Sequence, residues 1–228
     1  MQIHVLFETN DFLVVNKPPG LVVHPFDHSN EATLLDLLHA HDATIFSIHN
    51  EKKLMDGRII NLGGMVHKLD RDTSGVMVIA KNKTTFEELS QQFKNHQITK
   101  TYLALLEGVI HDDHIIIDAP LGRNRKDYKQ TAYPKNLRGA LRDALTDLEV
   151  IKRSPTTTLV RLSPKTGRTH QLRAHMAHIG HPIVGDKAYG STIDSPRIML
   201  HAQQLSFSLL GEDYTFEASS PFTLETIK

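Results

Sequence analysis

Cysteine and tryptophan are both absent from this chain of 228 residues. The absence of cysteine excludes disulfide-bonded scaffolds and zinc modules with cysteine ligands. At this length a single mixed domain buries a sufficient hydrophobic core without such cross-links. We therefore expect an ordinary globular protein that forms one domain over residues 1–228.

Long apolar runs are missing as well. No stretch approaches the roughly 20 consecutive apolar residues that a transmembrane helix needs. The amino terminus, MQIHVLFETNDF, lacks the basic segment followed by an apolar one that is typical of export signals. The sequence therefore predicts a cytoplasmic protein that does not bind a membrane.

A net charge of one sign is also missing, because 26 Lys and Arg residues balance 26 Asp and Glu residues. The balance hides an asymmetry along the chain. Residues 121–187 contain 14 basic and five acidic residues and so carry +9, which leaves −9 for the remaining 12 basic and 21 acidic residues. A field divided in this way can hold a polyanion on its basic part. A basic surface that is merely solvated has the same pattern, and charge alone favours that interpretation.

The hydrophobic pattern predicts many strands and few helices. Strands are expected over residues 3–7, 12–16, 21–23, 76–80, 101–108, 145–151, 157–163, 197–207 and 214–218. Helices are expected over 33–41, from the capping-box signals at 84–85 to about 93, and from about 169 to 179. Residues 42–62 are predicted to be loop, and residues 121–143 to be irregular for much of their length. Because strands and helices do not alternate regularly, we predict an α+β fold with a largely antiparallel sheet and a few packed helices.

The segment HKLDRDTSGVMVIAKN, residues 67–82, is the first that could carry chemistry. It places Asp70 at the end of a strand, just before a turn, and such positions present side chains to clefts. The residues that follow Asp70, among them Asp72, Thr73, Ser74 and Gly75, are also favoured turn formers. Taken by themselves, these residues favour a structural aspartate at position 70.

The segment KTGRTHQLRAHMAHIGHPIVGDKAYG, residues 165–190, raises the question of a metal-dependent hydrolase. Its histidines are His170, His175, His178 and His181. Their spacing matches no known ligand signature, no carboxylate lies among them, and glycine and proline interrupt the helix around the last one. We therefore expect histidines of the core or the surface, and no metal site.

A third segment, GRNRKDYK at residues 122–129, combines four basic residues with a tyrosine. That composition suits stacking on a base and pairing with phosphates. An exposed loop has the same composition, so the segment alone does not decide between the two.

Five segments, taken in order, resemble the motifs of the RluA-type family of RNA pseudouridine synthases. They are NKPPGLVVHP (16–25), HKLDRDTSG (67–75), KTYLA (100–104), GRTHQLRAHMAHIGHPIVGDKAYG (167–190) and LHA (200–202). The resemblance extends over nearly the whole chain, from about residue 5 to residue 218. One such motif can arise by chance, whereas five in the family's order are specific.

The resemblance implies an isomerase that converts chosen uridines to pseudouridine in structured RNA, ribosomal or transfer RNA. Such an enzyme breaks the bond between base and ribose and rejoins the base through carbon, with no cofactor and no metal. The resemblance assigns Asp70 as the essential catalytic carboxylate, Tyr102 as the ring that stacks on the target base, and Arg173 as the partner of the aspartate. The other residues expected to bind the RNA are His67, Lys68, Arg168 and Gln171.

Lys68 departs from the family pattern, which usually has arginine at this position. The family's arginine reaches into the gap that the flipped nucleotide leaves. Lysine keeps the positive charge but lacks the planar fork that stacks and bonds bidentately. The resemblance further implies an RNA-binding cleft lined or flanked by residues 121–187, a monomer, and no obligate protein partner. Two alternatives stay open: an RNA-binding module of the same fold without activity, and the histidine-based metal hydrolase.

Overall fold

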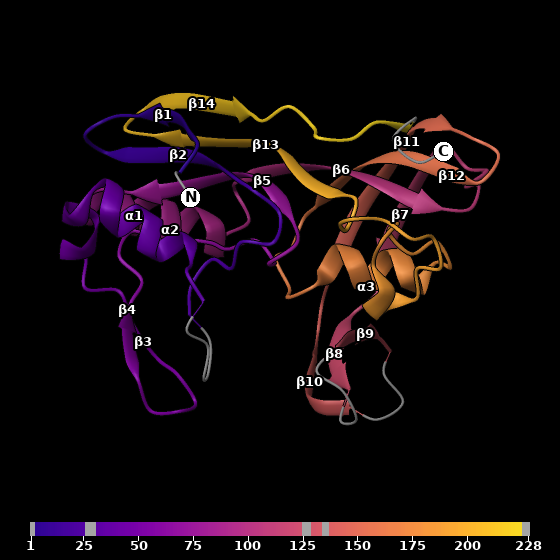
Figure 1. Ribbon diagram of the computed structural model, residues 1–228, viewed down its shortest axis with the longest axis horizontal. Helices are drawn as coiled ribbons and strands as arrows, with labels where there is room; N and C mark the ends of the chain where they lie inside the picture. The colour runs from indigo at the N-terminus through magenta and orange to yellow at the C-terminus, as the bar shows by residue number, and fades with distance from the viewer. Residues whose placement is uncertain (1–2, 26–30, 125–128, 134–136, 225–228) are drawn as a thin grey trace. The chain divides into compact units, whose positions relative to one another are not determined.

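The computed structural model describes residues 3–25, 31–124, 129–133 and 137–224 (Figure 1). The chain forms two compact units. Unit 1 comprises Met1–Thr99 and Gln204–Ala218, and unit 2 comprises Lys100–Gln203 and Ser219–Lys228. Within the described residues, no helix is long and apolar enough to span a bilayer.

Antiparallel strands form the centre of unit 1. Strand β1 (Val5–Glu8) pairs with β2 (Phe12–Lys17), β2 pairs with β5 (Ser74–Ala80), and β13 (Leu200–Leu209) pairs with β14 (Glu212–Glu217). All seven residues of β5 are buried, as the continuous apolar run at 76–80 predicts for a strand covered on both faces. The strand predicted at 21–23 is wrong, because this segment is loop.

The helices of unit 1, α1 (Leu34–His41) and α2 (Lys83–Lys94), lie on one face of the β1-β2-β5 sheet (Figure 1). Helix α2 begins earlier than predicted, because Asn82 rather than Thr84 or Thr85 caps it and accepts a hydrogen bond from the N–H of Thr85 at 2.9 Å. The loop predicted over 42–62 contains a 3-10 turn (Ala43–Ser47) and a hairpin of β3 (Glu51–Lys53) and β4 (Ile59–Asn61). These strands are too short and too exposed to leave a hydrophobic pattern.

Unit 2 contains two sheets. The larger has the order β6-β12-β11-β7, with antiparallel pairs of β6 (Thr99–Glu107), β12 (Thr157–Pro164), β11 (Leu145–Arg153) and β7 (His114–Asp118). The smaller has the order β10-β8-β9, formed by β8 (Leu121–Asn124), β9 (Gln130–Ala132) and β10 (Leu137–Arg142). Much of the range 121–143 is therefore strand where irregular structure was predicted. Residues 125–128 of the GRNRKDYK segment, and residues 134–136, lie outside the described part of the chain.

Helix α3 (Gln171–His178) and a 3-10 turn (Lys187–Tyr189) complete unit 2. The helix starts two residues later than predicted, because His170 has a left-handed backbone conformation with φ of 53°. The segment predicted as a strand from 197 becomes β13 only from Leu200 onward.

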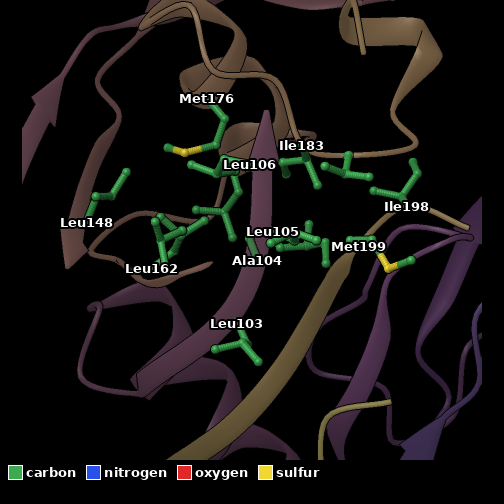
Figure 2. Packing of buried hydrophobic residues seen from close by; sticks show 14 of the residues in the cluster. Leu103, Ala104, Leu105, Leu106, Leu148, Leu162, Met176, Ile183, Ile198 and Met199 are labelled. Atoms are coloured by element: carbon green, nitrogen blue, oxygen red, sulfur yellow. The ribbon is translucent and has the colours of Figure 1, made fainter. Parts of the chain in front are cut away.

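Each unit has its own hydrophobic core. In unit 2, Leu103, Leu105 and Leu106 of β6 pack with residues of the neighbouring strands and of α3, such as Leu162 and Met176 (Figure 2). The core of unit 1 is formed by residues such as Phe12, Val14, Val78, Leu89 and Phe207. Full burial of such a side chain stabilises a fold by roughly 1.5–3 kcal/mol. Strands that pair antiparallel, with helices that do not alternate with them, confirm the predicted α+β class.

Candidate active site

Asp70 lies in a tight turn of unit 1 that leads into β5. The N–H of Thr73 donates to the carbonyl oxygen of Asp70 at 3.2 Å, which closes the turn. The preceding Leu69 is buried and anchors the segment, while Asp70 itself is partly exposed. The turn thus holds the backbone of Asp70 in place and leaves its carboxylate within reach of solvent.

Lys17, at the end of β2, fixes this turn from the other side. Its ammonium donates to the carbonyl oxygens of Pro18 and Leu21 at 2.9 Å and of Arg71 at 2.8 Å. The side chain is completely buried, and a buried ammonium needs such partners. Lys17 therefore ties the NKPPG segment to the residue that follows Asp70. Its position between a buried strand and two prolines is the only sequence signal for this role.

His67 and Lys68 precede Asp70 and differ in environment. The Nε2 atom of His67 accepts a hydrogen bond from the N–H of Val78 at 3.1 Å, and its ring stacks on Phe93 with centroids 4.6 Å apart. These contacts give His67 a structural role inside unit 1. Lys68 is exposed. Burial, and to a smaller extent the charges of Lys52 and Lys68, lower the pKa of His24. The ammonium of Lys52 lies 3.3 Å from Nε2 of His24.

Arg173 of α3, in unit 2, is held from two sides. Its Nε and Nη2 groups donate to the carboxylate of Asp186 at 2.6 and 2.8 Å, and both side chains are buried, at 10% and 1% exposure. Its guanidinium carbon lies 4.8 Å from the centre of the Tyr189 ring. The hydroxyl of Tyr189 in turn accepts the N–H of Gln130 at 3.1 Å and lies 3.0 Å from Nδ1 of His170. A bidentate pair and a stacked ring together determine the direction of the guanidinium.

Asp186 and Tyr189 were not identified from the sequence. Both lie in the GDKAYG segment, 13 and 16 residues after Arg173. Neither spacing belongs to a helix or a strand pattern, so no local signal marks them as partners of the arginine.

Gln171 organises the loop before α3. Its side-chain oxygen accepts from the hydroxyl of Thr166 at 2.7 Å and from the N–H of Arg168 at 3.0 Å. Its side-chain nitrogen donates to the carbonyl oxygen of Leu145 at 3.0 Å and to the hydroxyl of Thr146 at 3.1 Å. An amide side chain offers two donors and one oxygen with two lone pairs, so these contacts use its full capacity. Gln171 is buried and shapes the loop that carries Arg168.

Tyr102 and Arg168 are partly exposed residues of unit 2. Tyr102 lies on β6 opposite Leu162 of β12 and packs against the edge of the core. Arg168 donates from Nε to the carbonyl oxygen of Asp143 at 3.0 Å. Of the residues predicted to bind RNA, His67 and Lys68 therefore belong with Asp70 to unit 1, and the other four belong to unit 2.

The histidines of residues 165–190 serve separate contacts. His175 is fully buried between the hydroxyl of Thr146 and the carbonyl oxygen of Ala119, each at 2.9 Å, and burial lowers its pKa. His181 contacts the carbonyl oxygen of Glu107 at 2.8 Å. Across the described part of the chain, no three side chains of the types that ligate metals are grouped as a site.

The family model described as RNA pseudouridylate synthase matches residues 11–178. The chain belongs to the RNA pseudouridylate synthase family. The matched region runs from β2 through α3 and includes Asp70, Tyr102 and Arg173. Family membership confirms the resemblance drawn from the five motifs and the prediction that the protein is an isomerase of uridine in RNA.

Curated relatives and solved structures agree with this assignment. The chain is 38% identical over 225 residues to the uncharacterized RNA pseudouridine synthase YlyB of Bacillus subtilis (strain 168), with 97% of this chain and 70% of that one covered. It is 34% identical over 210 residues to ribosomal large subunit pseudouridine synthase D of Borreliella burgdorferi, with 91% and 61% covered. The solved structure of Human RNA Pseudouridylate Synthase Domain Containing 1 matches with a TM-score of 0.78 and 29% identity, covering 99% of this chain and 86% of that one. This family member therefore shares its fold with a solved structure.

Proposed function

We propose that this protein converts one or more uridines of structured RNA to pseudouridine, with large-subunit ribosomal RNA as the first candidate substrate and transfer RNA as the second. The printed names of relatives such as ribosomal large subunit pseudouridine synthase D support this order. The observation that carries the proposal is the presence of Asp70, Tyr102 and Arg173 at the matching motif positions, with the turn of Asp70 and the guanidinium of Arg173 each held by buried partners.

The target base must leave its helix before the bond beneath it can be reached. Extrusion of a nucleotide costs a few kcal/mol. In the proposed reaction the ring of Tyr102 stacks on the extruded base, and such stacking returns roughly 1–3 kcal/mol. Lys68 contributes a positive charge near the vacated position, without the stacking surface of an arginine.

Asp70 is the proposed catalytic carboxylate. In the reaction the bond from the ribose carbon to N1 of uracil breaks, a bond to C5 forms, and the proton of C5 is lost while N1 gains one. A carboxylate can serve as the nucleophile or as the base in these steps. Burial of a bare carboxylate under a bound base is costly. Arg173 offsets that cost as the proposed partner of Asp70, with its direction set by Asp186 and Tyr189.

The remaining residues and properties complete the proposal. Arg168 contacts the RNA directly, while Gln171 and His67 act through the segments that they hold. The segment 121–187, which belongs to unit 2, supplies basic residues that line or flank the RNA-binding cleft. The enzyme works in the cytoplasm as a monomer, without a cofactor, a metal or an obligate protein partner.

Mapping of pseudouridine tests the proposal. Total RNA is compared from cells with the gene, without it, and with the gene restored as wild type, Asp70→Asn or Asp72→Asn, using carbodiimide-dependent stops of reverse transcription. Asp72 lies in the same turn and is the matched control. We expect at least one stop to vanish on deletion and to return with wild type and Asp72→Asn but not with Asp70→Asn.

Purified proteins give the second measurement. Asp70→Asn is expected to bind RNA while forming no product. Product formation by purified Asp70→Asn would refute the assignment of the catalytic carboxylate. RNA binding by wild type with no modified site in any RNA would instead favour a binding module without activity.

A further inference from the structure

Lys100 is a residue of unit 2 to which the proposed reaction assigns no role. It lies on β6, two residues before Tyr102. Side chains two residues apart on a strand leave it on the same face. Lys100 and the proposed base-stacking ring therefore share one face at the start of β6.

The ammonium of Lys100 is half-buried and weakly bonded. Among the described residues its only hydrogen bond goes to the carbonyl oxygen of Thr166, at 3.4 Å, and it has no acidic partner. An ammonium has three donors, and 3.4 Å is at the long limit of hydrogen-bond distances. Burial lowers the pKa of Lys100, and no carboxylate opposes that effect.

Other shielded lysines of this protein are satisfied much better. Lys17 donates to three carbonyl oxygens at 2.8 to 2.9 Å. Lys81 lies 2.7 Å from a carboxylate oxygen of Glu8 and 3.0 Å from one of Asp42. Within the described part of the chain, the fold thus supplies strong acceptors to Lys17 and Lys81 but only one long bond to Lys100.

Gly167 places no side chain beside this ammonium. A Cβ atom at position 167 would lie 3.9 Å from Nζ of Lys100, so a larger side chain there would reach over the ammonium. Gly167 is exposed, and the same loop also carries the exposed Lys165 and the partly exposed Arg168. The loop beside Lys100 therefore adds two further positively charged residues.

From this arrangement we infer that Lys100 binds a backbone phosphate of the RNA, next to the nucleotide whose base stacks on Tyr102. A phosphate oxygen supplies the strong acceptor that Thr166 alone does not, and the neighbouring cations of the loop favour an anion. The position relative to Tyr102 rests on the proposed function. The phosphate contact itself rests on the geometry of Lys100 and its loop.

The salt dependence of RNA binding tests this contact. Each phosphate neutralised by a lysine makes the plot of log affinity against log salt steeper by about 0.7–0.9. We expect Lys100→Gln to flatten that slope by about this amount. Between about 50 and about 200 mM salt, the affinity of wild type for a large-subunit ribosomal RNA transcript should then fall by a factor about three times larger than the affinity of Lys100→Gln does. Lys100→Arg should restore the slope, and Lys94→Gln, which removes an exposed lysine at the end of α2, should leave it unchanged.

A second variant guards against failure of Lys100→Gln to fold. Gly167→Leu keeps the charge of Lys100 but places a side chain over its ammonium. The backbone at position 167 is not in the left-handed region, so we expect this variant to fold. We expect it to bind RNA several-fold more weakly than wild type. A structural role for Lys100 predicts the opposite pattern, with lowered thermal stability and an unchanged slope for Lys100→Gln, and normal binding for Gly167→Leu. Either of those results overturns the phosphate contact. Wild-type protein that binds RNA but modifies none would refute the proposed function, and the slopes would still decide the role of Lys100.

Discussion

The buried pair of Arg173 and Asp186 gives the sharpest energetic prediction. Its two hydrogen bonds, at 2.6 and 2.8 Å, join side chains that are 10% and 1% exposed. Removal of one partner from a buried ion pair typically costs 3–5 kcal/mol, because the other charge is left in a poorly solvating environment. Asp186→Asn keeps the size of the side chain and one acceptor oxygen but turns an amide N–H₂ toward the guanidinium. We expect it to lower the free energy of unfolding by about 3 kcal/mol.

A double-mutant cycle isolates the interaction from the cost of either substitution. Arg173→Met removes the cation and leaves the carboxylate of Asp186 buried without its partner, so it should cost a similar amount. The double variant Arg173→Met/Asp186→Asn removes both charges. We expect it to be more stable than the sum of the single losses predicts, by about 2–3 kcal/mol.

Urea unfolding followed by far-UV circular dichroism measures all four proteins, which suits a chain without tryptophan. Losses that add to within about 0.5 kcal/mol would refute the reasoning, since residues that do not interact behave in that way. If the pair also sets the direction of Arg173 for the reaction, Asp186→Asn should lower the single-turnover rate of pseudouridine formation while RNA affinity is retained.

Two further predictions concern close packing and pH. Gly64→Ala should prevent folding or lower the free energy of unfolding by more than about 3 kcal/mol, because its Cβ atom would lie 1.7 Å from the carbonyl oxygen of Ala80. Gly57→Ala, which has open space around it and φ of +90°, should lower it by only about 1–2 kcal/mol. Thermal melts compare the two variants, and equal losses of stability would contradict this reasoning. Burial lowers the pKa of His175 from 6.5, so as the pH falls the unfolded chain takes up this proton before the folded chain does. The stability that neutral His175 contributes is therefore complete above about pH 6.5 and is lost as the pH falls toward the folded pKa. Unfolding measured from pH 7 to pH 5 should therefore show a weaker pH dependence for His175→Gln than for wild type, by at most about 1.4 kcal/mol per pH unit, and parallel curves would exclude the effect.

Local patterns in the sequence determined much of the fold and the family. The apolar run at 76–80 predicted a strand covered on both faces, and every residue of β5 is buried. Phe86, Leu89 and Phe93 recur at positions i, i+3 and i+7, which is the spacing of one helix face, and α2 contains all three. Burial periodicity is a local property, because each residue of an element repeats the environment of its neighbour one turn or two residues away. The order of the five motifs similarly identified the family and placed Asp70, Tyr102 and Arg173 within it.

The strands of residues 121–143 could not be predicted in this way. They are short, and many of their side chains are exposed, among them the basic Arg138 and Arg142, so no alternation of apolar and polar residues marks them. Backbone pairing of β8 with β9 and with β10, rather than a buried face, decides that they are extended.

Partner choice around the candidate active site was decided by the tertiary structure alone. The sequence shows an arginine in a helix, an aspartate 13 residues later, and a lysine before two prolines. Only the folded chain brings Asp186 into a bidentate pair with Arg173, and only there does Lys17 reach the carbonyl oxygen of Arg71, 54 residues away. A charged side chain accepts any partner of suitable chemistry within reach. Its choice is therefore determined by which distant segments the packed core holds beside it, and no local pattern in the sequence records that proximity.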